Sequence, residues 1–171
     1  MLYKYMIRLM TGVLVLSGIA VAQTERVDET YRINTGEPLE VYVDIDAGEL
    51  FVSRGNGDDN VTVYMNYTED EFDHRIDHDE RRNRVEIYLD KRGWSSDGDT
   101  EALVEIGLPP DAELYLDSKV KAGEIEMNLG DLRIRELNFS NLAGEVLIRF
   151  DRPNKIEMEY LSVSSKVGEM E

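Results

Sequence analysis

The segment Lys121-Ala122-Gly123-Glu124-Ile125 contains a four-residue phrase that returns along the chain. The phrase consists of a small or apolar residue, Gly, Glu and an apolar residue. Its four copies begin at residues 47, 122, 143 and 167. Each copy lies within a run of alternating apolar and polar residues, which is the pattern of a half-buried β-strand. The sequence therefore predicts an all-β architecture of repeated units.

The repeated glycine marks a corner in each unit. Gly123, Gly144 and Gly168 are 21 and 24 residues apart. Periods in the low twenties with short strands are typical of solenoids, in which each coil buries its apolar face on the next. Glycine tolerates positive φ and close backbone approach, because it lacks Cβ. We therefore predict structural turns at Gly48, Gly123, Gly144 and Gly168.

In stacked coils, the glutamate after each of these glycines would also form a column. Adjacent strands lie about 4.8 Å apart, where two exposed carboxylates repel by about 0.9 kcal/mol in water. A sheet tolerates this cost, so a solvated acidic ladder is one interpretation. The other is an edge that binds a divalent cation such as Ca²⁺. The glutamates concerned are Glu49, Glu124, Glu145 and Glu169.

Other candidate metal ligands have a less suitable spacing. His74 and His78 could share an ion on a helix, but on a strand they would lie about 13 Å apart. We interpret this segment, 68–84, as a solvated hairpin tip. The acidic segments 55–60 and 97–99 lack the twelve-residue spacing of a calcium loop and are interpreted as turns. We predict no cofactor and no metal site beyond the possible Ca²⁺ edge.

Three segments are expected along the chain. Residues 1–22 have the features of a signal peptide, with Lys4 and Arg8 before an apolar run and Ala20-Val21-Ala22 as the cleavage site. The run of about ten apolar residues is shorter than the roughly twenty of a spanning helix, so no membrane span should remain after cleavage. Residues 23–38 would form an N-terminal arm. Residues 39–171 would form one β-solenoid domain, which we expect to continue past residue 171 because solenoids normally end in a distinct cap.

The composition excludes several functional classes. The 171 residues include no cysteine and carry a net charge of −17, so disulfides, a Cys nucleophile and Cys-bound metal are excluded. Removal of Lys4 and Arg8 with the leader would bring the charge to −19. Such acidity repels nucleic acid and anionic lipid. The sequence contains no G-x-S-x-G motif and no phosphate-binding glycine loop, so no catalytic residue is predicted.

Longer motifs carry a family resemblance. The chain combines Asp46-Ala-Gly-Glu-Leu50, the run 61–67 (Val-Thr-Val-Tyr-Met-Asn-Tyr), the run 104–112 and the later Gly-Glu coils. This combination resembles the bacterial putative adhesin family, also called toastrack, which occurs in extracytoplasmic and envelope-stress proteins. The resemblance covers about residues 39–171. It implies a right-handed, β-helix-like stack of short strands without established catalytic residues.

From the residues and the resemblance together, we expect a non-catalytic, adhesin-like interaction module of the bacterial cell envelope. It would be periplasmic, cell-surface or secreted, with a protein or cell-surface glycan as its partner and self-association through the solenoid ends. Two alternatives stay open: an acidic module that binds divalent cations, and a β-helix enzyme acting on polysaccharides. An aromatic contact surface is a further hypothesis, from Tyr31, Tyr42, Tyr64, Tyr67, Tyr115 and Tyr160.

Overall fold

The computed structural model describes residues 23–93 and 102–170. The expected signal peptide and the acidic segment 97–99 lie outside the described residues. Every named element is a β-strand: β1 (Thr24–Arg32), β2 (Leu39–Arg54), β3 (Asn60–Thr68), β4 (Phe72–Asp79), β5 (Arg84–Lys91), β6 (Ala102–Leu108), β7 (Glu113–Asn128), β8 (Arg133–Arg149) and β9 (Tyr160–Val167). The predicted all-β class is confirmed.

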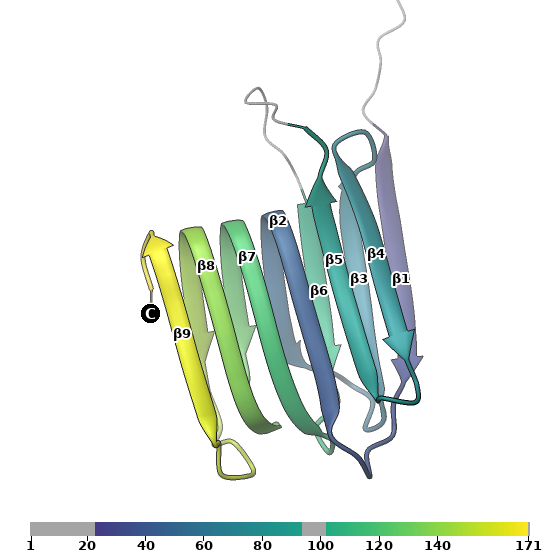
Figure 1. Ribbon diagram of the computed structural model, residues 1–171, viewed down its shortest axis with the longest axis vertical. Helices are drawn as coiled ribbons and strands as arrows, with labels where there is room; N and C mark the ends of the chain where they lie inside the picture. Colours follow the sequence, from purple (N-terminus) through teal and green to yellow (C-terminus); the bar gives the residue numbers. More distant parts are fainter. Residues whose placement is uncertain (1–22, 94–101, 171) are drawn as a thin grey trace, which may run out of the picture.

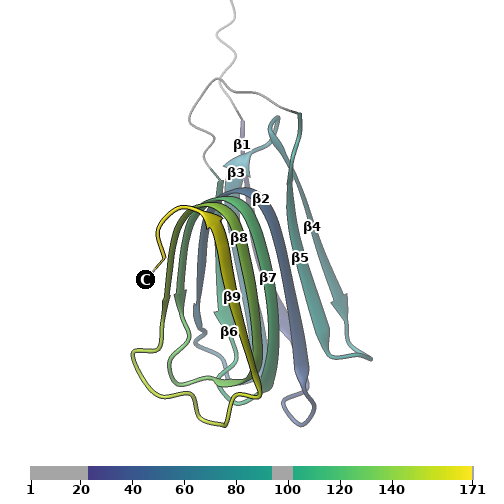
Figure 2. The ribbon, with the colours of Figure 1, turned by 60° about the vertical axis from the view of Figure 1, so that its left-hand side comes forward.

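The strands form two layers that share three long, bent strands (Figures 1 and 2). The first half of β2 pairs with β5, its second half pairs with β6, and both halves pair with β7. Strands β7 and β8 follow the same course in parallel register. We call β4, β5, β9 and the first halves of β2, β7 and β8 the front layer. The back layer contains β1, β3, β6 and the second halves of those long strands.

The corner between the layers is built on a column of glycines. Gly48, Gly123 and Gly144 are register partners across β2, β7 and β8. Gly123 has φ of 147° and Gly144 has φ of 125°, which L side chains rarely adopt. A Cβ added to Gly144 would lie 1.9 Å from the carbonyl oxygen of Gly123. Each corner therefore rests directly on the backbone of the corner before it.

The hydrophobic core lies between the two layers. The corner turns each long strand over, so that both of its halves direct alternate side chains inward. In β2, Val43 and Ile45 before the corner and Leu50 and Val52 after it are all buried. Two core positions depart from this pattern: Ser118 of β7 is fully buried and Asn141 of β8 is 4% exposed, and neither side chain has a hydrogen-bond partner within the described part of the chain.

The expected N-terminal arm contributes a strand to the back layer. Residues 24–32 form β1, which pairs antiparallel with β3, and β3 pairs antiparallel with β6. Val27 is the one residue of β1 that is buried. The segment 23–38 is therefore part of the layered structure, although its sequence is mostly polar.

The segment 68–84, which carries both histidines, also differs from the solvated hairpin tip that we predicted. It contains strand β4, in which Phe72, His74, Ile76 and His78 face inward and Asp73, Arg75, Asp77 and Asp79 face outward. The Tyr67 hydroxyl contacts Nδ1 of His74, and the ring centroids of Tyr31 and His78 are 5.2 Å apart. The histidines are half-buried between the layers, because the tyrosines of β1 and β3 cover them. They are not part of a solvated tip.

Candidate functional site

The outer face of the back layer, which we call the back face, holds the candidate site. Outward side chains of neighbouring strands are aligned there by the register, which produces two rows that run across the strands. We call the upper row the glutamate column: it consists of Glu49, Glu124 and Glu145 as register partners. Glu169 continues it, because its carbonyl accepts a 3.0 Å hydrogen bond from the amide of Val146.

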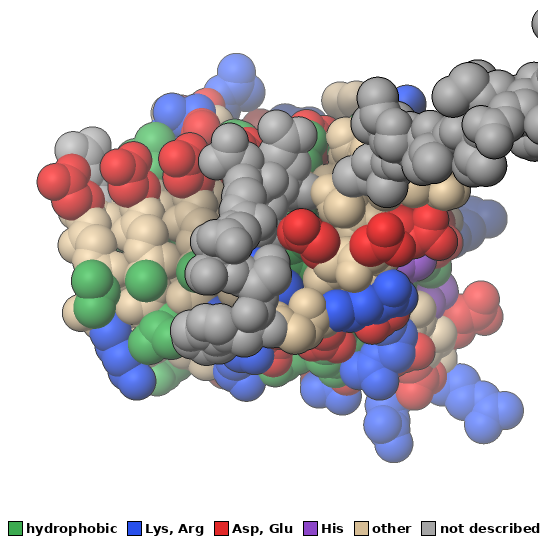
Figure 3. Space-filling model, turned by 90° about the horizontal axis from the view of Figure 1, so that it is seen from above, with side chains coloured by type: hydrophobic (Ala, Val, Ile, Leu, Met, Phe, Trp, Pro, Cys, Tyr) green, Lys and Arg blue, Asp and Glu red, His purple; other side chains and the backbone are tan. Residues whose placement is uncertain are grey.

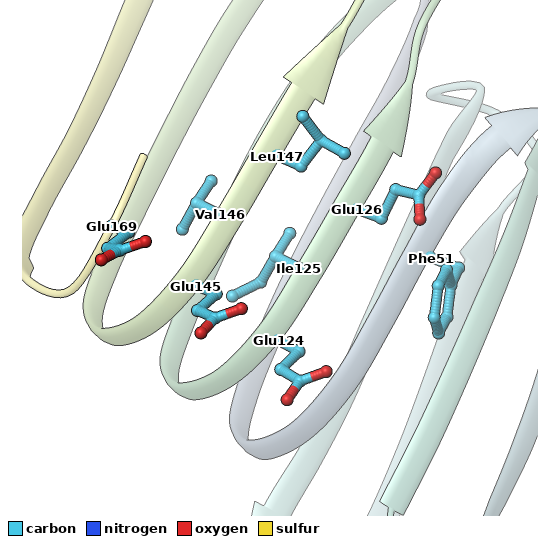
Figure 4. Close-up of a pocket in the computed structure, with 8 residues that line it drawn as sticks. All are labelled: Phe51, Glu124, Ile125, Glu126, Glu145, Val146, Leu147 and Glu169. Atoms are coloured by element: carbon cyan, nitrogen blue, oxygen red, sulfur yellow. The ribbon is translucent and has the colours of Figure 1, made fainter. Parts of the chain in front are cut away.

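The structure therefore brings all four predicted glutamates to one edge. Figure 4 shows Glu124, Glu145 and Glu169 along a hollow of about 310 Å³ that Phe51 and Leu147 also line. Within residues 23–93 and 102–170, however, no group of three or more His, Asp or Glu side chains could hold a metal ion. The column therefore presents a line of negative charge along this edge.

A second row lies directly below the glutamate column. It contains, in spatial order, Asp28 of β1, Tyr64 of β3, Glu105 of β6, Phe51 of β2, Glu126 of β7 and Leu147 of β8. Carboxylates alternate with apolar or aromatic side chains from one strand to the next. We call this set the acidic–aromatic row.

A groove of about 780 Å³ follows part of the acidic–aromatic row. It runs over β1, β3, β6 and the second half of β2, and Tyr64, Glu105 and Phe51 line it. Gly107 deepens the groove, because it has no side chain on the outer face; a Cβ there would lie 2.3 Å from the Thr62 hydroxyl oxygen. Phe51 is 37% exposed and lines both hollows, so they form one continuous surface.

Most carboxylates of the back face lack a cationic partner. Among the described residues, Glu126 pairs with Arg149, and Arg26 lies over the Tyr64 ring at 4.9 Å. The following carboxylates take part in no ion pair in the described part of the chain: Asp28, Glu49, Glu105, Glu124, Glu145 and Glu169. Figure 3 shows acidic side chains following one another along one side of the stack, with Lys and Arg projecting mainly on the opposite side.

The outer face of the front layer is different because many of its charges are paired internally. Arg84 lies 2.9 Å from Glu40 and 3.0 Å from Glu86, and Lys121 pairs with Asp46. Tyrosines of this face are also covered by cations, since Arg75 lies 4.0 Å from the Tyr88 ring centroid. The front face therefore offers fewer free groups to a partner than the back face does.

Arg135 of β8 pairs with two glutamates, Glu113 and Glu159. It is the extra residue of a β-bulge, because Leu114 pairs with Ile134 and Tyr115 pairs with Glu136. Its guanidinium donates two 3.0 Å hydrogen bonds to Glu113 and lies 3.0 Å from Glu159. The guanidinium holds the pKa of Glu113 below its usual value. This site links three coils and has a structural role.

The predicted tyrosine surface is divided: Tyr42, Tyr115 and Tyr160 line one hollow of about 330 Å³ on the front layer, whereas Tyr31, Tyr64 and Tyr67 lie elsewhere. Tyr67 is buried, and burial together with a hydrogen bond to Glu25 raises the pKa of its hydroxyl. Tyr42 contacts Lys119 on the front face, and Tyr64 alone belongs to the acidic–aromatic row. Phe51 was missed in the sequence, although its position between buried Leu50 and Val52 indicates an outward side chain.

Comparisons with known proteins agree with this architecture. A family model described as the N-terminal domain of toast_rack, DUF2154, matches residues 20–171. A crystal structure of a putative cell adhesion protein from Clostridium sporogenes has 16% sequence identity and a TM-score of 0.64, with 82% of this chain and 68% of that chain covered. A putative adhesin from Bacteroides fragilis has 10% identity and a TM-score of 0.40, with 75% of this chain and 64% of that chain covered. The chain thus spans about two thirds of the length of these neighbours.

None of the curated proteins matches the chain. Within the described residues, no helix is long and apolar enough to cross a membrane. The match to the Clostridium sporogenes structure, at 16% identity, concerns the arrangement of the strands.

Proposed function

This chain belongs to the toast_rack N-terminal domain family, and from that premise we propose that it is a non-catalytic, adhesin-like binding module that acts outside the cytoplasm. The back face carries the proposal. It combines a broad, regular sheet surface, an exposed Phe51 and a set of carboxylates that no ion pair neutralises within residues 23–93 and 102–170. Exposed apolar groups among charged groups are typical of interaction surfaces.

Two further observations support this function. The structural neighbour with the higher TM-score is described as a putative cell adhesion protein. Lys4, Arg8, the apolar run and Ala20-Val21-Ala22 form a signal-peptide pattern, which supports a location outside the cytoplasm.

The location can be tested by fractionating cells that express the full chain. We expect the protein in the extracytoplasmic fraction, with a mass that places its first residue near Gln23. Protein that stays in the cytoplasm with residues 1–22 attached would contradict the proposed location.

The binding role can be tested with beads that carry the purified protein. The beads are washed over intact bacterial cells and isolated envelope preparations, and the control beads carry the same protein after heat denaturation. We expect the cells and envelope preparations to retain more of the beads that carry folded protein. We also expect no soluble sugar or peptide to be released from the preparations. Equal retention by the denatured control would contradict a folded binding face, and steady product release would indicate an enzyme.

A further inference from the structure

The back face also indicates the chemistry of its partner, an inference that rests on the proposed binding role. Six of its carboxylates form no ion pair within the described residues. They lie on β1, β6, β2, β7 and β8 and just after β9, so their potentials add over one face. A partner that neutralises them gains electrostatic energy, and a neutral one does not. The charge therefore favours a cationic partner over a neutral glycan, nucleic acid or an acidic polysaccharide.

A single metal ion is a poor match for this surface. The described residues contain no group of three acidic or histidine ligands that could hold an ion. The carboxylates instead follow a line across the sheet, with one in the acidic–aromatic row on every second strand: Asp28, Glu105 and Glu126. A partner must distribute several positive charges along that line.

The spacing of the row selects an extended peptide. Alternate strands lie about 9.6 Å apart, which is twice the usual strand separation. Three residues of a polyproline II segment span about 9.3 Å and complete one turn, so that every third side chain points to the same side. A polyproline II chain lying across the strands would therefore place every third side chain above a carboxylate.

The apolar members of the row fit the stems of basic side chains. Tyr64, Phe51 and Leu147 lie between the carboxylates, and Lys or Arg can lay its methylene groups on such surfaces while its charge reaches an acid. An aromatic face also attracts the cation itself. The protein already shows this contact, because the Arg26 guanidinium lies 4.9 Å from the Tyr64 ring centroid, whereas Phe51 is left 37% exposed.

We propose that the acidic–aromatic row binds an extended segment of a partner protein with Lys or Arg at every third residue. The cations pair with Asp28 and Glu105 and exchange with Arg149 at Glu126, and their stems contact Tyr64, Phe51 and Leu147. The glutamate column above the row adds long-range attraction and speeds association at low salt.

The test measures the affinity of the purified full chain for labelled peptides by fluorescence anisotropy. The first probe is a five-repeat Lys-Pro-Ala peptide. One control replaces every Lys by Gln, and a second has the same composition with its lysines consecutive. We expect the regular Lys peptide to bind at least tenfold more tightly than the Gln peptide and several-fold more tightly than the clustered one, with affinity falling as salt increases.

Matched variants locate the binding surface. The back-face variant combines Asp28→Asn, Glu105→Gln and Glu126→Gln, and the front-face control removes the same charge by Asp77→Asn, Asp90→Asn and Glu136→Gln. All replaced side chains point into solvent, and thermal melts verify that both variants fold. We expect at least tenfold weaker binding for the back-face variant and less than twofold for the control.

Three results would overturn this proposal. Each can be distinguished from a failure of the proposed binding role, because the bead assay tests that role separately. Equal weakening in both variants would show attraction by net charge alone. Equal affinity for the regular and clustered Lys peptides would remove the spacing argument. Bead retention without measurable binding of any Lys peptide would mean that the module is adhesive through another chemistry, such as that of a glycan.

Discussion

The glycine column makes Gly144→Ala the most informative single substitution. The methyl group would meet two separate obstacles at the corner of β8. The backbone has φ of 125°, a conformation that costs a residue with Cβ about 1–3 kcal/mol. The Cβ would also lie 1.9 Å from the carbonyl oxygen of Gly123, so the corner must move away from its neighbour by more than about 1 Å to reach a normal van der Waals contact.

That movement weakens the pairing of β7 with β8 on both sides of the corner. The loss of two or three hydrogen bonds adds about 1 kcal/mol each, which brings the expected destabilisation to about 5 kcal/mol. Domains have a total stability of about 5–15 kcal/mol. At about 2–4 °C per kcal/mol for a domain of this size, the melting temperature should fall by about 10–20 °C.

Gly93→Ala is the matched control, because Gly93 has φ of 70° and an added Cβ there meets no atom of the described residues within 4 Å. This substitution carries the conformational cost of a positive φ, about 1–2 kcal/mol, without a close contact between the Cβ and a neighbouring carbonyl oxygen. Both variants should be compared with the wild type by thermal and urea unfolding followed by circular dichroism. If Gly144→Ala lost no more stability than Gly93→Ala, the close contact between corners would not be a determinant of this fold.

Three further predictions concern single side chains. Asn141→Val should raise stability by about 1–2 kcal/mol in urea unfolding, because a buried amide without a partner is removed; a lower stability would show that the amide is satisfied. Glu113→Gln should lower the melting temperature at pH 7. Arg135 depresses the folded pKa of Glu113 below its ordinary 4.5, so that stabilisation is present above pH 4.5 and is lost as the pH falls through the folded value. The two melting curves should therefore converge in acid, and a constant difference would contradict the ion pair. Tyr67 has a raised folded pKa, so its stabilisation is present below about pH 10 and lost above it. Tyr67→Phe should then show a flatter stability profile between about pH 9 and 11, and a parallel profile would contradict this account.

The stacked coils were predictable because the same backbone requirement occurs at each corner. A glycine with a close carbonyl neighbour is needed wherever a strand crosses between layers, so Gly123 and Gly144 recur with the period of the coil. Once coils stack in parallel, the residue after each glycine is aligned as well. The glutamate column follows from the sequence for this reason. Whether its carboxylates converge on a single ion depends on side-chain geometry, which the repeat does not specify.

The acidic–aromatic row was not predictable in the same way. It joins β1, β3 and β6, which lie beside β2 in the order β1-β3-β6-β2. That order is not sequential, so no periodicity in the chain aligns Asp28 with Tyr64 or Glu105 with Phe51. Strand β1 was itself missed as part of the sheet, because an edge strand with one buried residue, Val27, has little hydrophobic pattern.

The bent strands also determine how this protein responds to mechanical load. Strands β2, β7 and β8 each continue through both layers, so the layers are linked by covalent bonds at three successive corners and cannot slide apart under tension. A pull along the strands would shear many hydrogen bonds between neighbouring coils at once. A pull along the stack would open them one coil at a time. The mechanical unfolding force would therefore depend on the direction in which the chain is tethered.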